Sequence, residues 1–104
     1  MRLLENKVAL ITGASRGIGA AIALAMAEQG ALVAATATTA AGAENISQRL
    51  QAHGLKGKGF VLNLSDDASI KSLFAELQDF GLPNILVNNA GITVFKPIFE
   101  ATLE

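Results

Sequence analysis

Short apolar runs alternate with longer segments of helical periodicity along this chain. The apolar runs cover residues 8–11, 32–35, 60–62 and 85–87. The first run, Val8–Ile11, is continuously aliphatic, which is typical of a strand buried on both faces. Because strands that alternate with helices build a parallel sheet covered on both sides, the pattern predicts an α/β fold.

Two helices are predicted between the first three runs. Residues 19–29 are rich in Ala, and residues 43–53 have helical periodicity. The narrow apolar stripe of the second helix consists of Ile46 and Leu50. Gly30 is expected to end the first of these helices in the left-handed conformation that glycine favours, and Gly54 is expected to end the second.

A third helix is predicted before the last strand. It opens at Ser65, Asp66 and Asp67, which supply a capping side chain and two acids for the first turn. The expected apolar face consists of Ile70, Leu73, Phe74 and Leu77. Gly81 is expected to stop the helix.

Composition narrows the possible functions. A length of 104 residues with 51% hydrophobic residues suits one domain with a buried core. The chain has no Trp or Tyr to stack on bases, and its net charge of −1 leaves no basic stripe for phosphodiesters or anionic lipids. Nucleic acids and membranes are therefore not expected partners. Without Cys, and without a His, Asp and Glu cluster at metal-ligand spacing, no metal site is expected.

The apolar segments are too short for secretion or membrane insertion. Val8–Ile11 is shorter than a signal-peptide core, and the longest run of small apolar residues, Ala20–Ala27, ends at Glu28. The lack of cysteines is compatible with a reducing compartment. We therefore expect a cytoplasmic protein.

A glycine-rich turn joins the first strand to the first helix. Gly13, Gly17 and Gly19 have the spacing Gly-x-x-x-Gly-x-Gly, which differs from the common dinucleotide fingerprint. The physical logic is shared, because glycines let the backbone approach a pyrophosphate and the free N–H groups at a helix start favour negative charge. Arg16 adds a cation beside the proposed phosphates. The alternative is that the glycines only form a tight turn.

The end of the second strand discriminates between cofactors. NAD-binding folds usually place an acid there, about 20 residues after the glycine turn, to bind the ribose hydroxyls. Residues 36–39 are Thr-Ala-Thr-Thr instead. With no carboxylate to repel a 2′-phosphate, and with Arg16 and threonine hydroxyls available to bind one, the sequence favours NADPH over NADH. The threonines can also cap the next helix, and both roles can hold at once.

Two motifs carry a family resemblance. Thr-Gly-Ala-Ser-Arg-Gly-Ile-Gly at residues 12–19 and Asn-Asn-Ala-Gly at residues 88–91 resemble the signatures of the short-chain dehydrogenase/reductase family. Residues 62–66 and 85–93 look like the bacterial 3-oxoacyl-[acyl-carrier-protein] reductase branch. The resemblance implies a Rossmann-type doubly wound parallel sheet with strand order 3-2-1-4. Residues 1–104 would then be an NADP-binding domain that stops before the catalytic region.

The resemblance also implies a role for each matching position. The turn residues would cradle the pyrophosphate and the adenosine phosphate: Gly13, Ala14, Ser15, Arg16, Gly17, Ile18 and Gly19. Thr38 would help to hold the 2′-phosphate, and Asn63 and Leu64 would flank the adenine. The residues under the ribose and nicotinamide would be Asn89, Ala90 and Gly91. The alternative for Asn88 and Asn89 is hydrogen bonding to strand-end backbone.

The catalytic residues of the family are expected beyond residue 104. The family uses a Tyr as proton donor, a Lys four residues later and a Ser that orients the substrate carbonyl, whereas this chain contains no Tyr. The resemblance implies a homotetrameric parent enzyme of fatty acid biosynthesis. It would pass hydride from NADPH to the 3-ketone of an acyl chain on acyl carrier protein, and the Tyr would protonate the alkoxide.

Two departures and two alternatives accompany this interpretation. Asn84 stands where the family usually has Asp, and residues 94–97 are more similar to generic members than to the reductase branch. A reductase of sugars, alcohols or acyl-CoA ketones would keep the enzyme class. A non-catalytic nucleotide-binding module would keep only the fold, although residues 85–87 would then form an exposed apolar edge.

His53 is expected to be a solvated group at a helix end.

Overall fold

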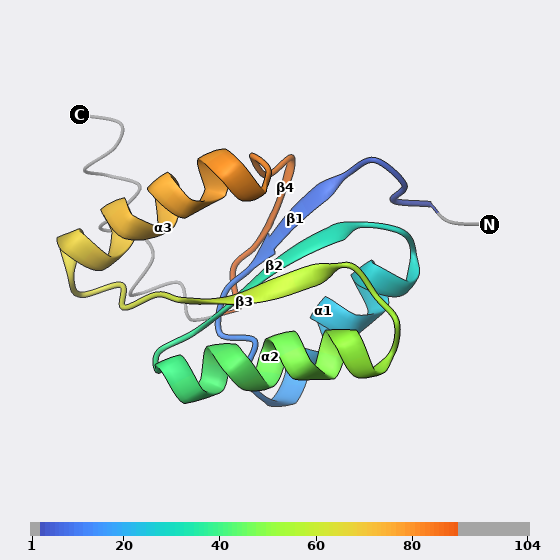
Figure 1. The fold of residues 1–104 in the computed structure, drawn as a ribbon, viewed down its shortest axis with the longest axis horizontal. Helices are drawn as coiled ribbons and strands as arrows, with labels where there is room; N and C mark the ends of the chain where they lie inside the picture. Colours follow the sequence, from blue (N-terminus) through green and yellow to red (C-terminus); the bar gives the residue numbers. More distant parts are fainter. Residues whose placement is uncertain (1–2, 90–104) are drawn as a thin grey trace.

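The computed structural model describes residues 3–89 and has the predicted architecture. The strands are β1 Val8–Ile11, β2 Leu32–Ala37, β3 Gly57–Val61 and β4 Ile85–Val87. All neighbours in the sheet are parallel, and the order is β3-β2-β1-β4 (Figure 1). The helices are α1 Gly17–Glu28, α2 Ala40–Ala52 and α3 Asp67–Phe80. The predicted strand order is thus confirmed.

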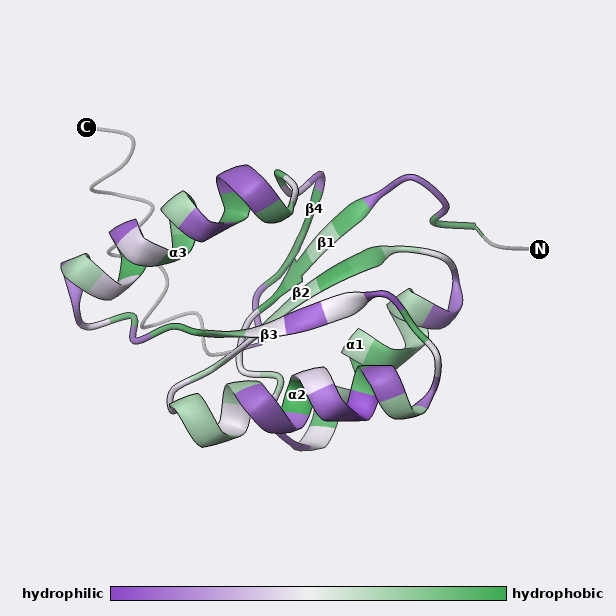
Figure 2. Cartoon of the chain, in the orientation of Figure 1, coloured by the Kyte–Doolittle hydropathy of each residue, from purple (hydrophilic) through white to green (hydrophobic). Residues whose placement is uncertain are grey.

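The sheet separates two hydrophobic cores. Helices α1 and α2 cover one face and α3 covers the other (Figure 1). Successive residues of β1 alternate between the cores, because neighbouring side chains of a strand point to opposite faces. Ala9 and Ile11 pack with Leu50 of α2, whereas Leu10 packs with Leu77 of α3. Strand β1 is therefore green in Figure 2, and its burial confirms the prediction of a first strand covered on both faces, whereas β3 at the edge of the sheet is largely white and purple.

Strand β3 begins earlier than its apolar run predicts. It starts at Gly57 and ends at Val61, whereas the apolar pattern indicated residues 60–62. Gly57 and Gly59 have no side chain, so the first part of the strand does not show up as a run of hydrophobic residues in the sequence. A Cβ at Gly59 would collide with the backbone carbonyl of Ala43, so this glycine lets α2 pack against the strand.

The start of α3 differs in one detail from the prediction. The capping residue is Asp66, whose Oδ1 accepts a hydrogen bond from the Ala68 N–H at 3.0 Å. Asp67 is then the acid of the first turn. Ser65 lies before the cap, where its hydroxyl donates to Asn63 Oδ1 at 2.7 Å. Asp66 caps the helix instead of Ser65 because its negatively charged carboxylate is also attracted to the positive end of the helix dipole.

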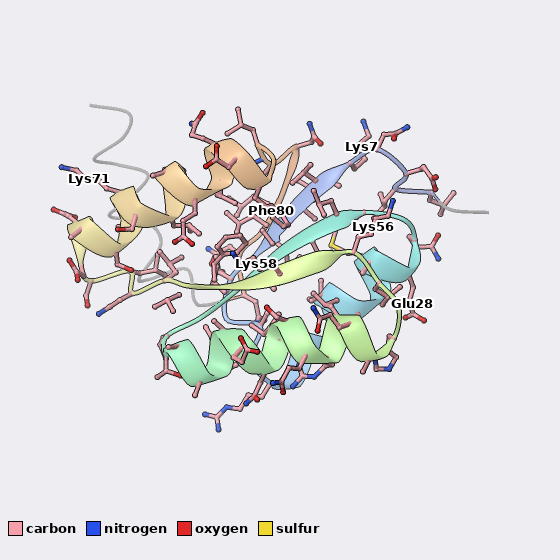
Figure 3. All side chains as sticks on the ribbon, viewed as in Figure 1. Lys7, Glu28, Lys56, Lys58, Lys71 and Phe80 are labelled. Atoms are coloured by element: carbon pink, nitrogen blue, oxygen red, sulfur yellow. The ribbon has the colours of Figure 1, made fainter. Side chains whose placement is uncertain are left out.

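The apolar face of α3 is narrower than predicted. Leu73 and Leu77 are buried, but the Phe74 side chain is 57% exposed, which corrects its assignment to the buried face. The helix is held at its other end by Phe80, whose ring meets Phe60 of β3 edge to face with centroids 5.2 Å apart. Lys58 lies over the Phe60 ring, and Phe80 lies between α3 and the sheet (Figure 3).

Charged side chains mark the edge at which the strands begin. Lys7, Glu28 and Lys56 lie there, at the opposite end of the sheet from the glycine-rich turn (Figure 3). Asn84 lies at the same edge, and its Oδ1 accepts a hydrogen bond from the Val8 N–H at 2.8 Å. The departure from the family's Asp is thus remote from the turn. Within residues 3–89, no helix is both long and apolar enough to cross a membrane.

The contact between β3 and α2 gives a stability prediction. We expect Gly59→Ala to lower the free energy of unfolding by about 1 to 3 kcal/mol, because the added methyl group overlaps the Ala43 carbonyl. Urea denaturation measures the change. Gly59 does not have a positive φ, so the loss of stability in Gly59→Ala is due to overlap and not to backbone strain; Gly54→Ala, with a φ of +67° and open space, measures the cost of strain without overlap. Unchanged or increased stability of Gly59→Ala would contradict the packing described here.

Candidate nucleotide site

The glycine-rich turn has the backbone conformation that its glycines permit. Gly13 and Gly17 have φ values of 64° and 66°, in the left-handed region that other residues rarely adopt. Gly19 serves a different purpose, because it lies against the carbonyl oxygen of Gly13 and the side-chain nitrogen of Asn89. A side chain at residue 19 would displace both groups. The helix can thus begin directly against the turn.

Strand β2 fixes one side of the turn. The Gly13 N–H donates to Thr36 Oγ1 at 3.3 Å, and the Ala14 N–H donates to the Thr36 carbonyl at 2.8 Å. Thr36 is 2% exposed. Its hydroxyl supports the turn and is buried, so of the threonine hydroxyls that the sequence offered for a 2′-phosphate, that of Thr36 is not available.

The end of β4 fixes the other side of the turn. Asn89 donates from Nδ2 to the Gly13 carbonyl at 2.9 Å and from its backbone N–H to Thr12 Oγ1 at 3.1 Å. Thr12 Oγ1 in turn approaches Asn88 Oδ1 at 3.5 Å. Hydrogen bonding to strand-end backbone, the alternative considered for Asn88 and Asn89, is thus confirmed for Asn89.

Helix α1 begins without a side-chain cap. Thr39 caps α2, which is the capping role considered as the alternative for the threonines of residues 36–39, and Asp66 caps α3. Arg16 at the start of α1 makes no capping hydrogen bond. The first N–H groups of a helix have no partner within the helix, so they are free to bind an anion at α1. Arg16 is exposed beside them, and the apolar side chain of Ile18 is 73% exposed.

A cavity of about 350 Å³ lies at the ends of β2 and β3, next to the turn. Its lining residues are Gly13, Thr36, Ala37, Thr38, Leu62, Asn63, Leu64 and Ser65. None of them is charged. The structure therefore brings Thr38, Asn63 and Leu64 together with Gly13, although they are far apart in the sequence.

The sequence interpretation missed some of these residues. Leu62 was assigned only to a strand, although it lies at the cavity, and Thr36 was not recognised as the support of the turn. The position of Leu62 at the carboxyl end of an apolar run could have indicated its place at the cavity, because ligands of such sheets bind at the carboxyl ends of the strands. Ala90 and Gly91, which complete the predicted set, lie outside the described residues. Within residues 3–89, no three His, Cys, Asp or Glu side chains gather as metal ligands.

The donor set matches a dinucleotide. Free N–H groups at an uncapped helix suit a pyrophosphate, and an uncharged cavity beside them suits an adenosine. A parallel sheet of order β3-β2-β1-β4 with this site at the carboxyl ends of its strands defines a dinucleotide-binding protein of the Rossmann type. A family model described as short chain dehydrogenase matches residues 7–104. The chain therefore belongs to the short-chain dehydrogenase/reductase family.

Three similar proteins from different bacteria carry the same name. The chain is 54% identical over 91 residues to the 3-oxoacyl-[acyl-carrier-protein] reductase FabG of Pseudomonas aeruginosa, a match that covers 86% of this chain and 37% of the relative. It is 54% identical over 90 residues to the reductase of the same name from Escherichia coli, with 86% and 36% covered. The Vibrio cholerae reductase is 55% identical over 91 residues, with the same coverage. The chain thus spans a little over a third of the length of these curated relatives.

The contribution of the Asn89 side chain to stability can be tested with two variants, Asn89→Asp and Asn88→Asp, that hardly change the size of the side chain. Asn89→Asp replaces the Nδ2 donor by an oxygen that faces the Gly13 carbonyl, so we expect the free energy of unfolding to fall by about 1 to 3 kcal/mol. Asn88→Asp is the control, because Asn88 contributes only an acceptor oxygen, which Asp retains. Urea denaturation of both variants measures the difference. Equal stability of the two variants would contradict the role of the Asn89 donor.

Proposed function

We propose that this chain is the NADP-binding part of a reductase that transfers hydride to the 3-ketone of an acyl thioester on acyl carrier protein. The observation that carries the proposal is the uncapped start of α1 beside a glycine turn that β2 and β4 hold in place. The names of the relatives support the substrate class, since all three are 3-oxoacyl-[acyl-carrier-protein] reductases. We place the Ser, Tyr and Lys of the family's chemistry beyond residue 104.

The proposed cofactor contacts follow the arrangement of the site. The backbone of residues 13–19 holds the pyrophosphate, and Asn63 and Leu64 lie beside the adenine in the cavity. Ile18 supplies an apolar surface next to the phosphates. Asn89 holds the turn from below, and with Ala90 and Gly91 it supports the ribose and the nicotinamide. When bound, the cofactor supplies the hydride, and this chain binds and orients it.

The preference for NADPH follows from the charges near the cavity. No carboxylate lines it, and Thr38 is exposed at its edge. Asp66, the next acid along the chain after the cavity residues, uses its carboxylate to cap α3. Arg16 is exposed on the turn and supplies a cation for a 2′-phosphate. A phosphate on the adenosine ribose thus meets hydroxyl and guanidinium groups and no negative charge.

A carboxylate at residue 38 is expected to reverse this preference. The assay uses the polypeptide expressed from its natural gene, with acetoacetyl-[acyl carrier protein] as substrate and NADPH or NADH as the hydride source. We expect the unmodified protein to have a kcat/KM at least about 10-fold higher with NADPH. Thr38→Asp should lower the value for NADPH about 10-fold or more and leave that for NADH within about 3-fold, because the new charge repels only the 2′-phosphate.

Thr38→Asn is the matched control, since it has the size of Asp without the charge. It should keep the preference for NADPH. No reduction of the thioester with either cofactor would overturn the proposed substrate. Equal losses with both cofactors in Thr38→Asp would overturn the proposed position of the 2′-phosphate.

A further inference from the structure

Arg49 connects α2 to the glycine-rich turn from a distant part of the sequence. Its Nη2 donates a hydrogen bond to the Ser15 carbonyl at 3.3 Å, across 34 positions of the chain. Arg49 is half-buried, and within residues 3–89 it forms no ion pair. Its positive charge therefore lies beside the turn without a carboxylate to neutralise it.

The geometry of α2 explains how Arg49 reaches the turn. The Cβ of a helical residue is tilted toward the helix N-terminus, so the long side chain of Arg49 extends back along α2. Gly42 lies seven residues earlier on the same face, and a Cβ built there would be 3.6 Å from the Ser15 Cβ. Helix α2 thus meets Ser15 at two levels, through a glycine near its start and through Arg49 in its last turn.

The hydrogen bond from Arg49 orients the next N–H group of the turn. The Ser15 C=O and the Arg16 N–H belong to the same planar peptide group and point in opposite directions. Because Arg49 draws the carbonyl toward α2, the Arg16 N–H points away from α2. Within residues 3–89, no acceptor binds this N–H. The guanidinium also polarises the peptide group, which makes that N–H a stronger donor.

We propose that Arg49 is a positioning residue for the phosphates of the nucleotide, acting through the Ser15–Arg16 peptide group. The inference rests on the proposed function, since it assigns a further residue to the same site. Arg49 itself binds the Ser15 carbonyl and not a phosphate. It fixes the direction of one donor and adds positive charge behind the turn, so its loss weakens nucleotide binding without removing a direct contact.

The test compares Arg49→Met and Arg49→Lys with the unmodified protein. Met keeps an apolar stem of similar length but removes the donor and the charge, whereas Lys keeps both. We expect Arg49→Met to raise the Kd for NADPH about 10-fold and its KM to a similar extent, with kcat within about 2-fold. Arg49→Lys should stay within about 3-fold of the unmodified Kd. Gln48→Met, on an exposed part of α2, is the control and should bind as the unmodified protein does.

A second measurement does not need the nucleotide. The NMR shift of the Arg16 amide in the nucleotide-free protein reports the orientation of the Ser15–Arg16 peptide group, and it should move in Arg49→Met more than in Gln48→Met. An unchanged amide shift together with an unchanged Kd overturns the role of Arg49, while the proposed function stands. If the unmodified protein fails to bind NADPH, the proposed function fails, but the amide shift still decides whether Arg49 orients the turn. If Arg49→Met does not fold, Arg49→Ala takes its place, because Ala also removes the donor and the charge. A moved Arg16 amide shift with a raised Kd supports the role of Arg49, and an unchanged shift with an unchanged Kd overturns it.

Discussion

The hydrogen bond from Asn89 to the Gly13 carbonyl is the contact on which the site depends most. It joins the end of β4 to the turn after β1, and it exists only because residue 19 has no side chain to occupy the same space. The carbonyl of a left-handed glycine points away from the neighbouring backbone, so it needs a donor from elsewhere in the fold. A side-chain amide at the adjacent strand end supplies that donor and fixes the position of α1.

The turn is held by hydrogen bonds from two neighbouring strand ends, and these leave the N–H groups at the start of α1 without a protein partner among residues 3–89. Thr36 is buried under the turn and accepts a hydrogen bond from the Gly13 N–H, and Asn89 donates one to the Gly13 carbonyl. The hydroxyl of Thr36 and the side-chain amide of Asn89 therefore support the turn, and the N–H groups at the start of α1 remain for the phosphates in our proposal. The start of α1 has no cap, unlike those of α2 and α3. An anion therefore gains the interactions that a capping side chain provides at the other two helices.

Much of this arrangement could be predicted from the sequence, and the exceptions have physical reasons. The bounds of β1 and β4 were predicted correctly because continuous aliphatic runs between polar residues leave little choice. The start of β3 was missed because Gly57 and Gly59 contribute close packing and no hydrophobicity. The turn was found from its glycines. Its contacts with Thr36 and Arg49 were not, since they depend on which helix face and strand end meet it across more than 20 positions.

The most direct test of the account measures hydrogen exchange of single backbone amides with and without NADPH. We expect NADPH to slow the exchange of the Arg16, Gly17, Ile18 and Gly19 N–H groups, because these groups would donate hydrogen bonds to the pyrophosphate. The amides at the start of α2 and α3 should be unaffected, since Gly42 and Ala68 already donate to capping side chains. Protection of other amides, with none at residues 16–19, would contradict the central claim.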